Sequence, residues 1–127
     1  MNNRIKPQIA VLEDHEDTRE LLKILLEDEF AVQDFKTAAE LLAALEHEKF
    51  ALVIADIMLP GVDGYGFIRT VRADKRFSDL PVIAVTALAM ASDREKGMRM
   101  GFTDYLVKPL EATQLKLMIR QSLDANT

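Results

Sequence analysis

Residues 51–56 read Ala-Leu-Val-Ile-Ala-Asp, five apolar residues that end at an acid. Two more segments are short apolar runs that end at a polar residue: Gln8–Glu13, which reads Gln-Ile-Ala-Val-Leu-Glu, and Pro81–Thr86, which reads Pro-Val-Ile-Ala-Val-Thr. A short, continuous apolar run is typical of a strand that is buried on both faces. Residues 51–56 therefore predict a central strand of a parallel sheet, with Asp56 at its carboxyl end.

Helical and extended patterns alternate around these three strands. Apolar residues at helical spacing predict five helices, over Asp17–Glu29, 37–47, Gly64–Ala73, 92–101 and Glu111–Leu123. The remaining strands are predicted over Phe30–Phe35, which is partly polar, and Phe102–Val107. Capping boxes are predicted at Thr37 with Glu40 and at Ser92 with Glu95. A turn is predicted at Pro60-Gly61.

Strands and helices thus alternate five times, which predicts an α/β fold with a parallel sheet covered by helices on both faces. No internal repeat, linker or low-complexity segment interrupts the pattern. We therefore expect a single domain over residues 1–127, with a core over about 8–123 and a free tail at Asp124–Thr127.

Composition excludes several classes of protein. The chain has 127 residues, a net charge of −5 and no cysteine, so a disulfide framework and thiolate chemistry are ruled out. The acidic balance argues against nucleic-acid binding, which needs clustered Lys and Arg. Met1–Gln8 lacks the apolar region of a secretory signal, and no apolar run is long enough to span a bilayer. We expect a cytoplasmic protein without a membrane partner.

Polar residues follow the predicted strands. Glu13 and Asp14 come after the first, Asp56 after the third, Thr86 after the fourth and Lys108 after the fifth. The carboxyl ends of parallel strands meet at one rim of the sheet, where ligands usually bind. Three carboxylates in a small space need a cation, and Mg²⁺ prefers oxygen ligands. A hydroxyl and an ammonium suit phosphoryl oxygens, and a carboxylate can be the nucleophile toward phosphorus.

Four motifs carry a resemblance to a known family. They are Val11-Leu-Glu-Asp14, Ile54-Ala-Asp-Ile-Met-Leu-Pro-Gly-Val-Asp-Gly64, Val85-Thr-Ala87 and Tyr105-Leu-Val-Lys-Pro109. Together and in this order they resemble the receiver domain of bacterial two-component response regulators, over nearly the whole chain. The resemblance implies a flavodoxin-like, doubly wound (βα)5 fold whose five parallel strands have the order 2-1-3-4-5.

The resemblance also implies a metal site. Asp14 matches the acid that binds the metal directly, and Glu13 matches the acid that acts on it mainly through water. Asp56 is expected to share the metal, together with the backbone carbonyl of Met58. The expected ion is Mg²⁺, with Mn²⁺ as the alternative.

The phosphoryl site follows in the same way. Asp56 matches the phosphoacceptor, and Thr86 and Lys108 match the groups that bind the phosphoryl oxygens. Tyr105 matches the aromatic residue that swings inward when Thr86 moves toward the phosphate. The residues that flank the path of attacking water in the family are here Met58 and Leu88. Neither side chain can orient water, so we expect slow loss of the phosphoryl group.

The implied partners are a histidine kinase or a histidine phosphotransfer domain as phosphodonor. A downstream protein or output domain would bind the face made by the fourth helix, fifth strand and fifth helix, and phosphorylation could bring two copies together. The chain would be a signalling domain rather than an enzyme, catalysing only its own phosphorylation and dephosphorylation. The start at Met1 favours a stand-alone receiver or an N-terminal one.

Three other classes compete with this interpretation. An aspartate-nucleophile phosphatase of the haloacid dehalogenase kind would need a second Asp where Met58 stands. A flavodoxin-like cofactor binder would need a phosphate-cradling loop after the first strand, but Glu13-Asp-His-Glu-Asp17 would repel a phosphate. A pseudo-receiver that only binds partners would not need the complete set of site residues.

A few residues outside the motifs also carry expectations. His15 is expected to be exposed beside the acid pair, and His47 to lie at a helix end. The methionines Met90, Met98 and Met100 are expected to fill gaps in the core. Leu117 falls off the apolar side of its helix and is expected to be exposed.

Overall fold

A computed structural model of the chain describes residues 5–59 and 64–125. Its five strands are all parallel and form one sheet in the order β2-β1-β3-β4-β5. They are β1 (Gln8–Leu12), β2 (Ala31–Phe35), β3 (Leu52–Asp56), β4 (Val82–Thr86) and β5 (Asp104–Val107). The predicted doubly wound fold and strand order are confirmed. The predicted turn at Pro60-Gly61 lies outside the described residues.

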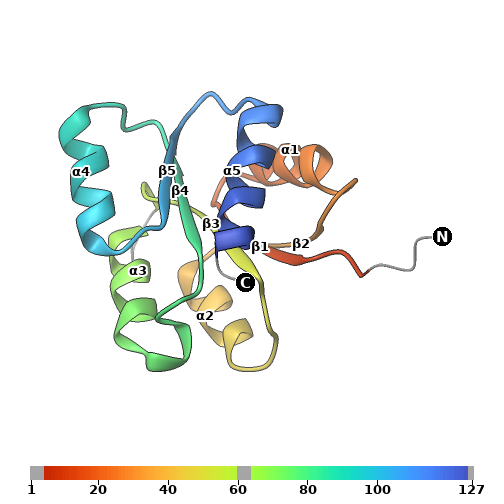
Figure 1. Ribbon diagram of the computed structural model, residues 1–127, viewed down its shortest axis with the longest axis horizontal. Coiled ribbons are helices and arrows are strands. Elements are labelled where there is room, and N and C mark those ends of the chain that lie inside the picture. The colour runs from red at the N-terminus through yellow and green to blue at the C-terminus, as the bar shows by residue number, and fades with distance from the viewer. Residues whose placement is uncertain (1–4, 60–63, 126–127) are drawn as a thin grey trace.

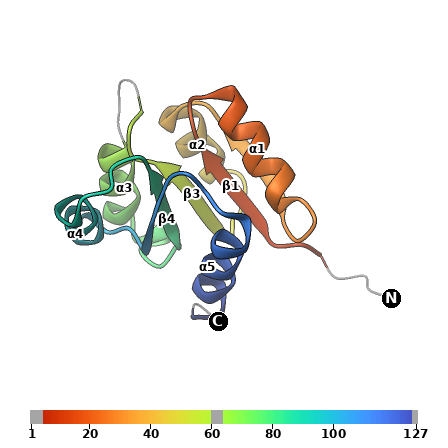
Figure 2. The ribbon, with the colours of Figure 1, turned by 90° about the horizontal axis from the view of Figure 1, so that it is seen from above.

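Helices cover both faces of this sheet (Figures 1 and 2). They are α1 (Glu16–Leu26), α2 (Ala38–Leu45), α3 (Gly64–Ala73), α4 (Ala91–Met100) and α5 (Ala112–Ala125), with a 3₁₀ turn η1 at Lys75–Phe77. Successive side chains of a strand point to opposite faces. Ile9 and Val11 of β1 therefore pack with α1 and α5, whereas Ala10 and Leu12 pack with α2 and α3.

Helix ends test the predicted caps. Thr37 and Glu40 form the predicted capping box, in which the Thr37 hydroxyl accepts from Glu40 N at 3.2 Å and the Glu40 carboxylate accepts from Thr37 N at 3.1 Å. The prediction for Ser92 was wrong. Helix α4 begins one residue earlier, and the Asp93 carboxylate accepts from Met90 N at 3.2 Å. The predicted free tail was also wrong in part, because α5 continues to Ala125.

The exposed fractions of the side chains test which residues were correctly predicted to lie in the core. Leu117 is exposed as expected, but Met90 and Met98 are exposed as well, and Met90 keeps 70% of its surface accessible. Only Met100 of that group packs against the core. Leu21 of α1 is likewise exposed. Across the described residues we find no helix with the length and apolar character that a bilayer crossing requires.

Candidate functional site

The register of the sheet brings the predicted site residues together at one rim. Leu12 pairs with Ala55, so the residues that follow them, Glu13 and Asp56, emerge side by side. Asp56 pairs with Val85, which places Thr86 one residue beyond it on the next strand. Thr86 in turn pairs with Val107, and Lys108 follows directly. The parallel pairing therefore delivers the acids, the hydroxyl and the ammonium to the same edge.

Lys108 links the two buried acids of this rim. Its Nζ atom donates to Asp56 Oδ2 at 2.8 Å and to Glu13 Oε1 at 3.0 Å. Glu13 is fully buried and Asp56 is 3% exposed, so the ammonium neutralises charge where water is scarce. Burial opposes the charge on Lys108, but the bonds to Asp56 and Glu13 outweigh it and raise the pKa of Lys108 above its usual value.

The second oxygen of Asp56 is held by the backbone that follows it. Asp56 Oδ1 accepts from Met58 N at 2.9 Å, while Gly64 N donates to the Ile57 carbonyl at 2.8 Å. A Cβ atom at Gly64 would lie 2.5 Å from Ile57 Cα and 2.6 Å from the Asp56 carbonyl oxygen. Only glycine allows α3 to start this close to the strand end. From the sequence, Gly64 was predicted only as the first residue of a helix, without this positioning role.

The acid pair after β1 is anchored by an arginine that sequence reasoning missed. Arg19 donates to the backbone carbonyls of Glu13 and Asp14, each at 3.1 Å, and its Nε donates to Asp34 Oδ2 at 3.0 Å. The sequence around Arg19 does not indicate this role, because its contacts join α1 to β2 and to the residues that follow β1. Arg19 fixes the backbone from which both acids project.

Asp14 has a buried carboxylate oxygen without a hydrogen-bond donor among the described residues. Its Oδ1 atom is buried and accepts no hydrogen bond from any residue within 5–59 and 64–125. A buried carboxylate oxygen without a donor is costly. A hard cation would satisfy it, so the observed acids fit the Mg²⁺ that the resemblance implies. The Met58 carbonyl remains a predicted ligand.

His15 lies against the same acids. The side chain is 71% exposed, as expected, yet Nδ1 is 3.1 Å from Glu13 Oε2 and 3.3 Å from Asp14 Oδ1. His15 N also donates to Glu13 Oε2 at 3.1 Å. The ligand atoms of these three residues all lie within 4.8 Å of one another.

Thr86 and Tyr105 meet at the loop that follows β4. The fully buried Thr86 hydroxyl accepts from Leu88 N at 3.3 Å, and the Tyr105 hydroxyl donates to the Leu88 carbonyl at 2.8 Å. The Tyr105 ring thus points inward, against Gly97, where an added Cβ would lie 3.0 Å from the ring. Burial, followed by the nearby Tyr65 and Asp93, raises the pKa of Tyr105 to about 12. The swing of this ring remains a prediction.

Both residues expected to flank attacking water are apolar and differ in exposure. Met58 is 55% exposed, whereas Leu88 packs partly against the core. Neither offers a polar side-chain group to the space beside Asp56. The expectation of a long-lived phosphoryl group therefore stays a prediction.

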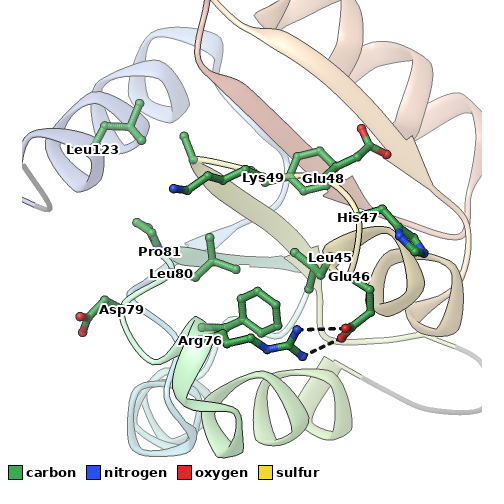
Figure 3. A pocket seen from close by; sticks show the side chains of 13 residues that line it. Leu45, Glu46, His47, Glu48, Lys49, Arg76, Asp79, Leu80, Pro81 and Leu123 are labelled. Carbon is green, nitrogen blue, oxygen red and sulfur yellow. Dashed lines mark hydrogen bonds and ion pairs between the residues drawn. The ribbon is translucent and has the colours of Figure 1, made fainter.

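A cavity of about 620 Å³ lies at the opposite end of the sheet, near the starts of β3 and β4 (Figure 3). Phe50, Leu80 and Pro81 line it, and Arg76 at its edge donates to both carboxylate oxygens of Glu46, at 2.9 and 2.7 Å. None of its lining residues belongs to the rim described above. We assign the candidate functional site to the rim, because the Asp56 carboxylate, the Lys108 ammonium and the Thr86 hydroxyl converge there.

Comparison with known proteins agrees with this geometry. The family model for the response regulator receiver domain matches residues 9–120. An uncharacterized 14.6 kDa protein from Leptolyngbya boryana is 38% identical over 95% of this chain and 93% of its own length. Response regulator Rre1 from Synechocystis is 38% identical over 91% of this chain but only 51% of its own length. The chain therefore spans about half the length of several curated relatives.

Solved structures give the same result. The receiver domain of the sensor histidine kinase PA1611 from Pseudomonas aeruginosa, with a magnesium ion in its active-site cleft, is 26% identical. It superposes with a TM-score of 0.86 over 94% of this chain and 98% of its own. A sensor protein from Polaromonas sp. JS666 is 29% identical, with a TM-score of 0.86 over 95% of this chain and 98% of its own. This chain belongs to the response regulator receiver domain family.

Proposed function

We propose that Asp56 accepts a phosphoryl group from a phosphohistidine, in a reaction that depends on Mg²⁺. The observation that carries this proposal is the pair of bonds from Lys108 Nζ to Asp56 Oδ2 and Glu13 Oε1. A buried carboxylate held by an ammonium is poised to keep a phosphoryl oxygen beside the same ammonium. The phosphodonor would be a histidine kinase or a histidine phosphotransfer domain.

In the reaction, an oxygen of the Asp56 carboxylate attacks phosphorus and forms a new O–P bond. The N–P bond of the donor breaks, and the histidine nitrogen keeps the bonding electron pair. Lys108 stays beside the transferring oxygens, and Thr86 donates its hydroxyl to one of them. Positioning and charge stabilisation of this kind supply most of the catalysis in phosphoryl transfer.

Glu13, Asp14, Asp56 and the Met58 carbonyl would hold the metal ion. Once bound, Mg²⁺, or Mn²⁺ in its place, offsets negative charge on the phosphoryl oxygens. The Asp14 Oδ1 atom supports this assignment, because it is buried and accepts no hydrogen bond from the described residues.

A new bond from Thr86 to the phosphoryl group would compete with the one that its hydroxyl now accepts from Leu88 N. Tyr105 holds the carbonyl of the same residue, so the two side chains share one loop segment. Movement there would reach α4 and β5. Figure 1 shows β5, at the edge of the sheet, between α4 and α5.

The face made by α4, β5 and α5 is therefore the proposed output surface. It would bind a downstream protein or output domain in one of the two states, a population shift biased by the added charge. Self-association of two phosphorylated copies through this face is part of the proposal. Residues 1–127 would act as one receiver domain in the cytoplasm.

The test is treatment of the purified protein with acetyl phosphate and Mg²⁺, followed by intact mass spectrometry. We expect one phosphoryl group on the wild-type chain, none without the metal, and none on Asp56→Asn. Equal labelling of the Asp56→Asn variant would contradict the proposal. A chromogenic phosphomonoester in the same assay separates this function from a phosphatase, which would turn it over repeatedly.

A further inference from the structure

The histidine beside the acid pair carries an inference about which metals this site selects. Nδ1 of His15 lies 3.1 Å from Glu13 Oε2 and 3.3 Å from Asp14 Oδ1. One nitrogen and two oxygens thus converge from three consecutive residues. A receiver site made only of carboxylates and a carbonyl would offer oxygen alone.

The backbone explains why the ring turns back toward the acids. His15 is the N-cap residue of α1 and has an extended conformation, with φ −84° and ψ 121°. Its backbone N–H bonds to Glu13 Oε2, and Arg19 holds the two preceding carbonyls. The ring itself is largely exposed, so core packing does not hold it. Its contacts with the carboxylates set its orientation instead.

The spacing of these atoms suits a shared cation. Metal–nitrogen and metal–oxygen bonds to divalent ions of this size are about 2.0–2.2 Å. Neighbouring ligands of an octahedral shell with such bonds lie about 3 Å apart, by simple geometry. The distances from Nδ1 to the two carboxylate oxygens match such edges. The alternative is a plain hydrogen bond from the ring to Glu13, without any role in metal binding.

Asp14 favours the ligand role over the plain hydrogen bond. Its Oδ1 is buried and accepts no hydrogen bond from the described part of the chain, although Nδ1 of His15 is only 3.3 Å away. A cation between the two atoms would satisfy both. Imidazole nitrogen binds cobalt, nickel and zinc well, whereas Mg²⁺ prefers oxygen.

We propose that His15 adds a nitrogen ligand, through Nδ1, to the metal held by Asp14, and so raises the affinity of the site for transition metals relative to Mg²⁺. This inference rests on the metal site of the proposed function. It assigns one more ligand to that site and states which class of ion the site prefers.

The chain contains its own matched control. His15 and His47 are its only two histidines. Both are exposed, and His47 lines the cavity at the opposite end of the sheet. Substitution of either residue leaves the core untouched, and a change in metal binding can be assigned to position rather than to loss of a histidine.

The experiment is calorimetric titration of the full, chelator-treated chain with Co²⁺ and, separately, with Mg²⁺. We expect His15→Ala to weaken Co²⁺ binding by about tenfold or more and to change Mg²⁺ binding by less than about twofold. His47→Ala should match the wild type for both ions. Equal weakening of both ions in His15→Ala, or equal loss of Co²⁺ in the two histidine variants, would overturn the inference.

Two further measurements separate this inference from the proposed function. With Zn²⁺, the ring resonances of His15 should shift in NMR spectra while those of His47 stay in place; unshifted His15 signals would refute the ligand role. Asp14→Asn should lose both Mg²⁺ and Co²⁺ binding. Mg²⁺ binding that survives Asp14→Asn would overturn the metal site itself, and the role of His15 with it.

Discussion

The Nζ atom of Lys108 lies 2.8 Å from Oδ2 of Asp56, although the two residues are 52 positions apart in the chain. The same ammonium also binds Glu13 at the end of another strand. One cation therefore neutralises two buried carboxylates, and the stability of the rim depends on it.

Lys108→Ala should lower the free energy of unfolding by about 2 kcal/mol, because two buried carboxylates lose their donor. Added Mg²⁺ should recover part of that loss, since a cation can replace the missing charge. Urea unfolding with and without Mg²⁺ measures both effects. Lys49→Ala, at an exposed lysine, should change stability by less than about 0.5 kcal/mol. A Lys108→Ala variant as stable as this control would show that the bonds contribute little.

Gly64→Ala should destabilise the fold by about 1–3 kcal/mol and slow phosphorylation of Asp56. The added Cβ would lie 2.5 Å from Ile57 Cα, so the backbone beside Asp56 must move. Thermal unfolding and the rate of labelling by acetyl phosphate test the two parts. Normal labelling in a destabilised variant would mean that Gly64 supports the fold but does not position Asp56.

The Tyr105 phenol should ionise only at unusually high pH. Burial and charged neighbours raise its pKa to about 12, above the value of about 10 in an unfolded chain. Because the folded pKa is the higher one, the phenol contributes stability below pH 10 that is lost as the pH rises from about 10 through 12. The chain has two tyrosines, so Tyr65→Phe leaves Tyr105 as the only tyrosine, and burial, the largest cause of the raised pKa, remains in this variant. Tyrosinate absorbance near pH 10 in the folded variant would disprove the shift.

The two predicted capping boxes offer a direct comparison. Thr37→Ala should cost about 1 kcal/mol, because the helix loses the hydroxyl that accepts from Glu40 N. Ser92→Ala should cost less than about 0.5 kcal/mol, since Ser92 lies inside α4 and is exposed. Chemical unfolding of both variants measures these changes in the free energy of unfolding. Similar losses at the two positions would argue against the assigned start of α4.

Met58→Asn should shorten the lifetime of the phosphoryl group by about tenfold, because a polar side chain can orient the attacking water. The loss of phosphate from labelled protein, followed by mass spectrometry, measures this rate. Met98→Asn replaces another exposed methionine, away from Asp56, and should leave the rate unchanged. A lifetime of seconds in the wild type would itself contradict slow hydrolysis.

Much of the fold could be predicted from local patterns. Apolar runs such as residues 51–55 identify buried strands, because a strand covered on both faces needs apolar residues at successive positions. The Thr37 cap was also predictable, since its partner is only three residues away. Boundaries were correct within a few residues, and α3 begins and ends at Gly64 and Ala73 as expected.

Surface exposure was harder to predict where distant elements decide it. Met90 and Met98 are apolar, but no neighbouring element covers them in the described part of the chain. The Ser92 cap failed because Asp93, one residue further on, accepts from Met90 N instead. Such competition between adjacent polar residues depends on where the preceding loop enters the helix.

The amino-acid sequence by itself determined the alternation of strands and helices and the acids at strand ends, because both follow from the order of neighbouring residues. Only the tertiary structure decided that Lys108 binds Glu13 and Asp56, that Tyr105 points inward against Gly97, and that His15 turns back to Asp14. These contacts depend on strand register and on backbone direction, which long-range packing sets.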